Sequence, residues 1–158
     1  MLIAVLSDTH RYESYIKMAA KMCKDADVIL HLGDNSSDVE IIKKETGKDV
    51  IFVKGNCDID RSAKVEQIIE LENKKIFMTH GHEYGVKSGL LNLHYRGMEV
   101  GADIVLYGHT HIASIEKHDG IWFVNPGSVS LPRGLKHTIA FIEIKDGVIN
   151  SWLQDIMI

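Results

Sequence analysis

Short apolar runs alternate with amphipathic segments in the first third of the chain. Residues 2–6, 28–32 and 50–53 are almost wholly apolar, and each run has the length of a buried strand. Residues 12–23 place apolar side chains on one face of a helix, and a second helix is expected at 36–46. Strands that alternate with helices predict a largely parallel sheet.

The middle of the chain has a less regular pattern. Residues 65–71 fit either a strand or a helix, and residues 72–75 indicate a hairpin turn into a strand at 76–79. Residues 104–107 predict another short strand. A helix is expected at 86–100, and one of its faces would carry Leu90, Leu91, His94, Tyr95 and Met98.

Two Asp-Gly pairs organise the end of the chain. Asp119-Gly120 and Asp146-Gly147 each separate runs of alternating residues, which is a strong signal for a hairpin. About the last 45 residues therefore predict an antiparallel meander. The whole pattern indicates an α/β fold in which two sheets pack face to face with helices outside, within a single domain spanning residues 1–158.

Composition narrows the possible functions. Apolar residues make up 45% and charged residues 25% of the chain, as in ordinary globular proteins. The net charge of −4 argues against a broad basic face, so we do not expect an extended nucleic acid as partner. Two cysteines provide no disulfide framework, and no apolar run is long enough for a signal peptide or a membrane span. We therefore expect a soluble, cytoplasmic protein with no membrane partner, and a homo-oligomer is possible.

Polar side chains follow five of the expected strands directly. Ligands bind beyond the carboxyl ends of strands in open α/β sheets, so these side chains are expected to meet in one crevice. Within the first and last groups the side chains are two residues apart, and in extended backbone they would point to the same side. The candidate residues are Asp8 with His10, Asp34, Asn56, His80, and His109 with His111.

These seven side chains offer nitrogen and oxygen donors without a thiolate. Such donors suit Mn²⁺, Fe²⁺, Co²⁺, Ni²⁺ or Zn²⁺. They are more than one tetrahedral ion needs, and they fit two ions that share a bridging carboxylate. Two divalent ions would exceed the negative charge of Asp8 and Asp34, so the site could acidify a bridging water and stabilise a phosphoryl transition state.

Simpler interpretations exist for each of these residues. Asp8 and Asp34 could cap helices, since each precedes a helical segment. His109 and His111 could form a surface turn, and Asn56 could be a turn residue only. Among the other candidates we expect His31, His94 and Cys23 in the core, His118 and His137 in solvent, and Cys57 either as a reactive thiol or as a buried, inert residue.

Taken together, the motifs resemble those of the calcineurin-like metallophosphoesterases, and most closely their small bacterial and archaeal phosphodiesterase branch. The resemblance extends from Met1 to beyond Ser128 and implies a four-layer αββα sandwich of two mixed sheets flanked by helices. The motifs that carry it are Asp8-x-His10, Gly33-Asp34, Gly55-Asn56-Cys57-Asp58, His80-Gly81-His82, Gly108-His109-x-His111 and Asn125-Pro126-Gly127-Ser128.

The resemblance also implies roles for single residues. One ion would be bound by Asp8, His10, Asp34 and His111, and the other by Asp34, Asn56, His80 and His109, with Asp34 as the bridge. Family habit favours Mn²⁺. Asn56, His82 and Asp58 are the expected catalytic residues. Many family members carry His where this chain has Cys57, and a neutral thiol is a poor proton donor, so Asp58 or His82 would have to compensate.

The activity implied is hydrolysis of a small phosphate ester, preferably a diester, by a hydroxide that bridges two divalent ions. Two alternatives remain at this point. Some relatives of this fold, such as the small retromer subunit, are non-catalytic protein-interaction scaffolds with degraded metal sites, whereas all seven ligand positions here carry competent donors. The second alternative is a nucleic-acid processing enzyme. The nucleases of this family are larger proteins, and this chain has few aromatic residues and a net negative charge, so extended contacts with DNA are not expected.

Overall fold

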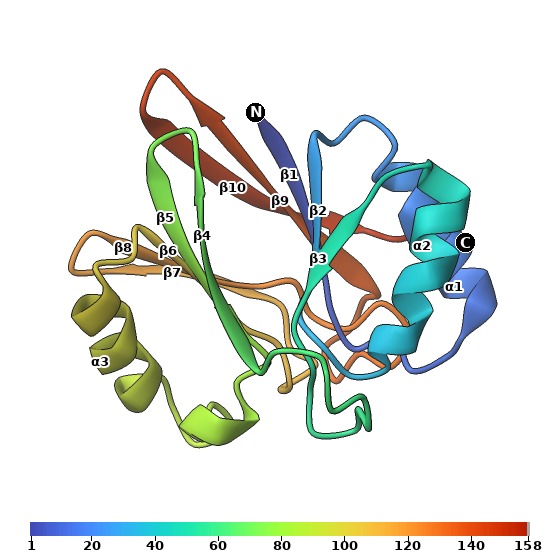
Figure 1. Ribbon diagram of the computed structural model, residues 1–158, viewed down its shortest axis with the longest axis horizontal. Helices are drawn as coiled ribbons and strands as arrows, with labels where there is room; N and C mark the ends of the chain where they lie inside the picture. Colours follow the sequence, from blue (N-terminus) through green and yellow to red (C-terminus); the bar gives the residue numbers. More distant parts are fainter. Residues whose placement is uncertain (158) are drawn as a thin grey trace.

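The computed structural model describes residues 1–157 and contains two five-stranded sheets packed face to face (Figure 1). The first sheet has the order β10-β9-β1-β2-β3. In this sheet β1, β2 and β3 are parallel, while β9 pairs antiparallel with both β1 and β10. Its strands are β1 (Leu2–Leu6), β2 (Val28–His31), β3 (Val50–Phe52), β9 (Thr138–Lys145) and β10 (Val148–Asp155).

The second sheet is also mixed and has the order β4-β5-β6-β8-β7. Strands β5, β6 and β8 are parallel, and the hairpins β4–β5 and β7–β8 add antiparallel edges. Its strands are β4 (Glu66–Leu71), β5 (Lys74–Thr79), β6 (Ile104–Leu106), β7 (Ser114–His118) and β8 (Ile121–Asn125).

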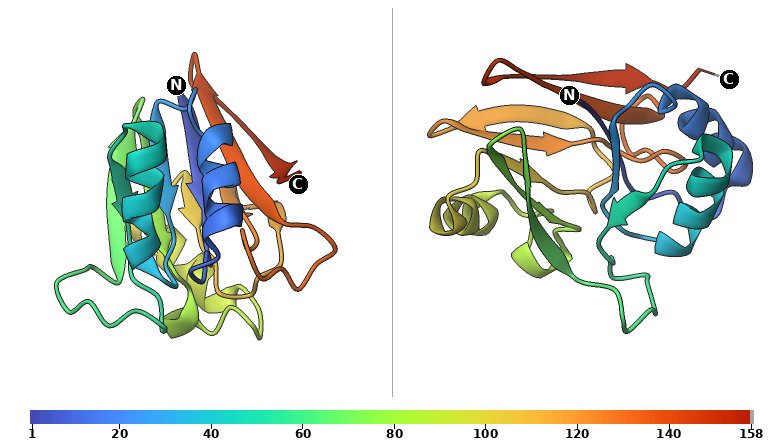
Figure 2. Two further views of the ribbon diagram at one scale, coloured as in Figure 1. Left: turned by 90° about the vertical axis from the view of Figure 1, so that its right-hand side faces the viewer. Right: turned by 45° about the horizontal axis from the view of Figure 1, so that its top comes forward.

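Helices cover the outer face of each sheet. Helices α1 (Glu13–Met22) and α2 (Val39–Thr46) lie side by side on the first sheet, as the left view of Figure 2 shows. Helix α3 (Leu91–Val100) packs on the second sheet. The short 3₁₀ helices η1 (Ser36–Asp38) and η2 (His82–Tyr84) follow β2 and β5. The expected four-layer α/β sandwich is thereby confirmed.

Strand β1 shows why the apolar runs are continuous. Ile3 and Val5 point into the core between the two sheets, whereas Ala4 and Leu6 point into the core under α1 and α2. A strand that is buried on both faces needs apolar side chains at every position. Three separate apolar clusters result: one between the sheets and one under the helices on each side.

The helix expected at 86–100 begins later, at Leu91. Gly85 and Gly89 have left-handed φ values of +60° and +139°, so the chain turns before the helix starts. The expected apolar face is also wrong, because Leu93 and Gly97 are buried whereas Leu91, Tyr95 and Met98 are exposed. Helix α3 packs so closely on the second sheet that a Cβ at Gly97 would lie 2.9 Å from Val105.

The expected meander at the end of the chain is two hairpins in different sheets. The Asp-Gly turns form as expected, with left-handed φ at Asp119, Gly120, Asp146 and Gly147. However, β7–β8 joins the second sheet and β9–β10 joins the first. The turn residues determine each hairpin locally, whereas the pairing of β8 with β6 and of β9 with β1 is long-range. In residues 1–157, no helix combines the length and the apolar character needed to span a bilayer.

Candidate metal centre

The candidate ligands lie in loops that leave the carboxyl ends of five strands, at one edge of the sandwich (Figure 1). The first sheet contributes the loops after β1, β2 and β3, which carry Asp8, His10, Asp34 and Asn56. The second sheet contributes the loops after β5 and β6, which carry His80, His109 and His111. The centre therefore lies where the two sheets meet, and each sheet supplies part of it.

Four of these side chains form a first cluster. Asp8, His10, Asp34 and His111 each offer one ligand atom, and these atoms all lie within 4.8 Å of one another. His111 Nε2 is 3.1 Å from Asp8 Oδ1 and 3.3 Å from His10 Nε2. His10 Nε2 lies 3.9 Å from Asp34 Oδ2. The composition and the spacing of this cluster suit a divalent cation.

A second cluster shares one member with the first. The ligand atoms of Asp34, His80 and His109 also lie within 4.8 Å of one another. His80 Nε2 is 3.4 Å from Asp34 Oδ2 and 3.1 Å from His109 Nδ1. Asp34 therefore belongs to both groups, which is the arrangement that a carboxylate bridging two ions requires.

The backbone at these residues is not extended, contrary to the expectation from spacing. Asp8, His10, Asp34, His109 and His111 all have left-handed φ, between +45° and +70°. This region is unfavourable for residues with a Cβ, by roughly 1 kcal/mol each, and the surrounding fold must hold it. The paired side chains converge through these tight turns rather than through the alternation of a strand.

Two backbone carbonyls determine which ring nitrogens are free. His80 Nδ1 lies 2.8 Å from the carbonyl oxygen of Leu32, and His111 Nδ1 lies 2.7 Å from that of Leu131. A carbonyl only accepts, so Nδ1 must carry the proton in both rings. In the neutral rings, Nε2 is then unprotonated and its lone pair faces the centre. This is the tautomer that a metal-binding histidine needs.

One buried carboxylate oxygen tests whether a cation fits. Asp8 Oδ2 accepts hydrogen bonds from Ser7 Oγ at 2.6 Å and from the backbone N–H of His109 at 3.2 Å. Asp8 Oδ1 is fully buried and has no hydrogen-bond partner of acceptable geometry. A buried, unpaired carboxylate oxygen is costly. Because Oδ1 faces the ring nitrogens of His10 and His111, a cation between them would satisfy it.

The electrostatics of the centre favour positive charge. Burial would raise the pKa of Asp8, but the neighbouring His10 and His111 hold it far below its ordinary value. Burial would likewise lower the pKa of His80, but Asp34 and Asp8 raise it. Both directions have one cause: two carboxylates in a dry pocket stabilise a cation beside them. The donor set therefore fits divalent ions on charge as well as on geometry.

The remaining expected site residues surround the clusters. Asn56 is exposed, between two residues that contact Asp34. The His82 ring lies 5.5 Å from that of His80 and 6.1 Å from that of His109. Burial and the charge of His80 lower the pKa of His82, so its ring is neutral near pH 7. His82 therefore faces the second cluster without belonging to it.

Asp58 connects the loops after β2 and β3. Its Oδ2 accepts from the backbone N–H of Gly55 at 2.7 Å and of Asp34 at 3.0 Å, and its Oδ1 accepts from that of Ser36 at 2.7 Å. Three donors therefore engage the two oxygens. This geometry favours a positioning role, in which Asp58 holds Asp34 and the Asn56 loop at a fixed separation.

The simpler interpretations of the aspartates do not describe the structure. The residue before α1 is Tyr12 and the residue before η1 is Asn35, so neither Asp8 nor Asp34 caps a helix. Cys57 is exposed, which excludes the buried, inert alternative. Desolvation by neighbouring atoms and the Asp34 carboxylate raise the pKa of its thiol. Cys23 lies in the core as expected.

The other histidines have structural surroundings. His31 is fully buried, where it accepts the backbone N–H of Gly33 at 3.1 Å and pairs with Thr9 Oγ1 at 3.1 Å. His94 is only half-buried and lies 3.0 Å from an Asp119 carboxylate oxygen. His118 is exposed. His137, expected in solvent, is half-buried and stacks on Tyr15 at 4.2 Å.

The Asn125-Pro126-Gly127-Ser128 motif supports the ligand loops through contacts that the sequence did not predict. Ser128 Oγ donates to the backbone carbonyl of Asp8 at 2.7 Å, and the Asn125 side-chain amide donates to Thr110 Oγ1 at 2.9 Å. The Asn-Pro-Gly-Ser motif thus contacts one ligand-bearing loop of each sheet and holds it in place. Ser7 could have been found from its place directly before Asp8, whereas the Asn125 contact joins loops far apart in sequence.

Two carboxylates and four imidazoles meet where the two mixed sheets join, as in a metallophosphoesterase. Residues 1–147 match the model of the calcineurin-like phosphoesterase superfamily domain. The chain belongs to this family, and the family implies divalent metal ions.

Curated relatives agree. A probable metallophosphoesterase of Bacillus subtilis is 38% identical over 134 residues, which cover 84% of this chain and 78% of the relative. A phosphodiesterase of Methanocaldococcus jannaschii is 31% identical over 150 residues, covering 80% of this chain and 83% of that protein.

Solved structures share the fold. A conserved Streptococcus pneumoniae protein, described as a predicted phosphoesterase, superimposes with a TM-score of 0.82 at 30% identity, covering 98% of this chain and 88% of its own. A Vps29 variant from Entamoeba histolytica superimposes with a TM-score of 0.80 over 98% of this chain and 99% of its own. Its identity is 22%, so it shows the fold alone.

Proposed function

We propose that this protein is a metal-dependent phosphoesterase that hydrolyses phosphodiesters. One observation carries the proposal: the Asp34 carboxylate is common to two clusters of metal-binding side chains. A shared carboxylate holds two ions close enough to act on one phosphoryl group. Two further observations support the proposal. The donors are oxygen and nitrogen atoms. The Asp8 Oδ1 atom, which has no hydrogen-bond partner, and the unprotonated Nε2 atoms of His80 and His111 face the centre.

The ligands proposed are those expected from the sequence. Asp8, His10, Asp34 and His111 would hold one ion, and Asp34, Asn56, His80 and His109 the other. Asn56 is the least constrained, because it is exposed and its position depends on the loop that Asp58 holds. The hard and borderline donors favour Mn²⁺, with Fe²⁺, Co²⁺, Ni²⁺ and Zn²⁺ as competitors.

The reaction proposed is addition of water to phosphorus and cleavage of one P–O ester bond. When bound, two divalent ions supply the charge that acidifies water and stabilises the phosphoryl transition state. The chain holds its carboxylates in fixed positions through Ser7, Asp58 and the backbone N–H of Cys57. His82, uncharged near neutral pH, faces the centre and is placed to orient substrate rather than to donate a proton. The departing alcohol takes its proton from solvent.

The diester preference rests on relatives and not on a single residue. A phosphodiesterase of Methanocaldococcus jannaschii is among the proteins similar to this chain. The alternative is a non-catalytic interaction scaffold of the same fold. Its support is the exposed apolar face of α3, formed by Leu91, Tyr95 and Met98.

One experiment decides between the two. The protein is stripped with chelator and assayed on bis(4-nitrophenyl) phosphate and 4-nitrophenyl phosphate, with Mn²⁺, Ni²⁺, Zn²⁺ or no metal. We expect metal-dependent turnover that Asp34→Ala abolishes and that is faster on the diester. If no metal supports turnover although about two ions bind per chain, as the shared carboxylate implies, then the scaffold is the better description.

A further inference from the structure

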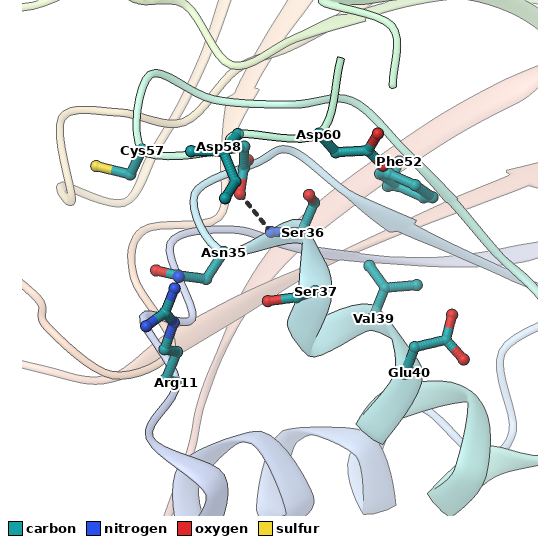
Figure 3. A pocket seen from close by; sticks show the side chains of 11 residues that line it. Arg11, Asn35, Ser36, Ser37, Val39, Glu40, Phe52, Cys57, Asp58 and Asp60 are labelled. Atoms are coloured by element: carbon teal, nitrogen blue, oxygen red, sulfur yellow. Dashed lines mark hydrogen bonds between the residues drawn. The ribbon is translucent and has the colours of Figure 1, made fainter. Parts of the chain in front are cut away.

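Two pockets are lined by residues that are chain neighbours of the candidate metal ligands. The first, here called the Arg11 pocket, has a volume of about 280 Å³ and includes Arg11, Asn35 and Cys57 in its wall (Figure 3). Each of these residues directly follows a candidate ligand in the chain: His10, Asp34 and Asn56 respectively. Three parts of its wall are thus joined to candidate ligands by one peptide bond each.

The second, here called the Lys87 pocket, has a volume of about 320 Å³. Its wall includes Thr110, the residue between His109 and His111, and Arg133, whose backbone N–H donates to the carbonyl oxygen of His111 at 3.0 Å. The wall of this pocket is therefore also connected to candidate ligands through the backbone.

The pockets belong to different halves of the sandwich. Residues 11–60 supply the whole wall of the Arg11 pocket, and residues 86–133 supply that of the Lys87 pocket. The centre draws its ligands from both halves. We propose that a phosphodiester binds with its phosphate at the centre and its two ester arms in separate pockets, an apolar arm in the Lys87 pocket and a hydroxylated arm in the Arg11 pocket. This inference rests on the phosphoesterase function proposed above.

The wall of the Lys87 pocket is mostly apolar. Val86, Leu90, Tyr107 and Ile112 contribute hydrocarbon and aromatic surface. Lys87 and Arg133 add two positive charges against the single carboxylate of Glu116. A flat, apolar arm without positive charge matches this wall, because the apolar surface gains by burial and the cations repel a cationic group.

The Arg11 pocket is the more polar of the two, although Val39, Phe52 and Ile59 also line it. The Arg11, Asn35 and Ser37 side chains all line it (Figure 3). Arg11 is held by its left-handed φ of +62° and by its backbone N–H, which donates to Asp38 Oδ2 at 2.8 Å. The Glu40 and Asp60 carboxylates at the other end of the pocket are exposed, and Asp58 adds a third carboxylate to the wall. Hydroxyl groups can donate to these carboxylates, whereas a second anion would be repelled.

Different substrates therefore report on the two pockets separately. A monoester has one arm and uses one pocket, whereas a diester uses both. Three substrates that release the same 4-nitrophenolate distinguish these cases. They are 4-nitrophenyl phosphate, bis(4-nitrophenyl) phosphate, and thymidine 5′-(4-nitrophenyl phosphate), whose second arm is hydroxylated.

Pocket-filling variants provide the test. Ser37→Trp fills the Arg11 pocket, with Ser37→Ala as its control, and Lys87→Trp fills the Lys87 pocket, with Lys87→Met as its control. We expect Ser37→Trp to raise KM for the thymidine ester about tenfold or more and to leave the monoester within about twofold. We expect Lys87→Trp to raise KM for all three substrates. Equal effects of Ser37→Trp on monoester and diester would overturn the inference.

A binding measurement separates this inference from the proposed function. The Zn²⁺-loaded protein is titrated with the phosphorothioate analogue of the thymidine ester, and its backbone amide NMR shifts are followed. We expect shifts at Arg11 and Asn35 and also at Ile112 and Arg133. Shifts in both groups without turnover of any ester would remove the enzyme proposal and keep the two-arm site. Turnover with shifts in one group only would do the reverse.

Discussion

Gly55 lies so close to Asp34 that its lack of a side chain is a requirement of the centre. A Cβ at this position would lie 2.2 Å from Asp34 Oδ1 and 2.7 Å from the Asp34 backbone nitrogen. Gly55 has no left-handed φ, so Gly55→Ala tests only this steric contact. The separation from Oδ1 would have to grow from 2.2 Å to 3.4 Å before the contact became ordinary.

Neither partner is free to move. The Gly55 backbone N–H donates to Asp58 Oδ2 at 2.7 Å, and Asp34 Oδ1 accepts the backbone N–H of Cys57 at 2.9 Å. Overpacking costs roughly 1–3 kcal/mol, and a lost hydrogen bond to a charged group roughly 1.5–3 kcal/mol. We expect Gly55→Ala to destabilise the metal-free protein by roughly 3–5 kcal/mol, which lowers Tm by roughly 8–15 °C in a chain of this size.

The assay is thermal and urea unfolding of the metal-free protein, followed by calorimetric titration with Mn²⁺. Gly134→Ala is the matched control, because a Cβ there meets nothing within 4 Å. We expect this control to stay within about 0.5 kcal/mol of wild type. The displaced Asp34 should also weaken metal binding by at least about tenfold. Wild-type stability and affinity in Gly55→Ala would refute the close contact.

Three further predictions follow from single residues. Burial lowers the pKa of His31 to about 4 from 6.5, so the fold holds the neutral ring. Stability is therefore full above pH 6.5 and falls by roughly 2–3 kcal/mol as pH falls toward 4, because the unfolded state takes up the proton. Urea unfolding of the metal-free protein should show this pH dependence in wild type and not in His31→Gln. Cys57→His should increase turnover of alkyl diesters, which have poor leaving groups, by about tenfold or more, since an imidazolium can donate a proton and a thiol with a raised pKa cannot; Cys57→Ser is the control, and equal rates in the two variants would contradict the reasoning. Asp58→Ala removes the acceptor of three backbone N–H groups, so it should cost roughly 2–4 kcal/mol of stability and weaken metal binding. The pH–rate profile should keep the shape of wild type. Loss of one limb of the profile would instead make Asp58 a proton-transfer group.

The sequence predicted the elements whose signal is local and strong. The three apolar runs of the first sheet and the hairpin turns at Asp119-Gly120 and Asp146-Gly147 form where their patterns placed them. The start of α3 was wrong because Gly85 and Gly89 interrupt the helical pattern with backbone that only glycine adopts readily. The choice of sheet for each C-terminal hairpin depended on pairings across the whole chain, which no local pattern carries.

The candidate site was predictable as a set of residues but not as a geometry. The order of the motifs brought Asp8, Asp34 and His80 to one edge of the sandwich, since each follows a strand. The left-handed turns that aim these side chains, and the bracing of two loops by Asp58, arise only from tertiary contacts. The exposure of Cys57 was likewise not predictable from the sequence, because it depends on how the loop after β3 folds over Asp34.

Because the ligands come from both sheets, ion binding and sheet packing are thermodynamically linked. An ion that binds only the assembled centre stabilises the sandwich by RT ln(1 + [M]/Kd), and it does so across the inter-sheet core of Ile3, Val5 and Ala140 rather than within one sheet. By the same linkage, a substitution that loosens this core reduces the apparent metal affinity to the extent that it populates the unassembled state, even though it touches no ligand. Metal affinity can therefore report on core packing some distance away, and the centre acts as a clasp between two halves of the fold.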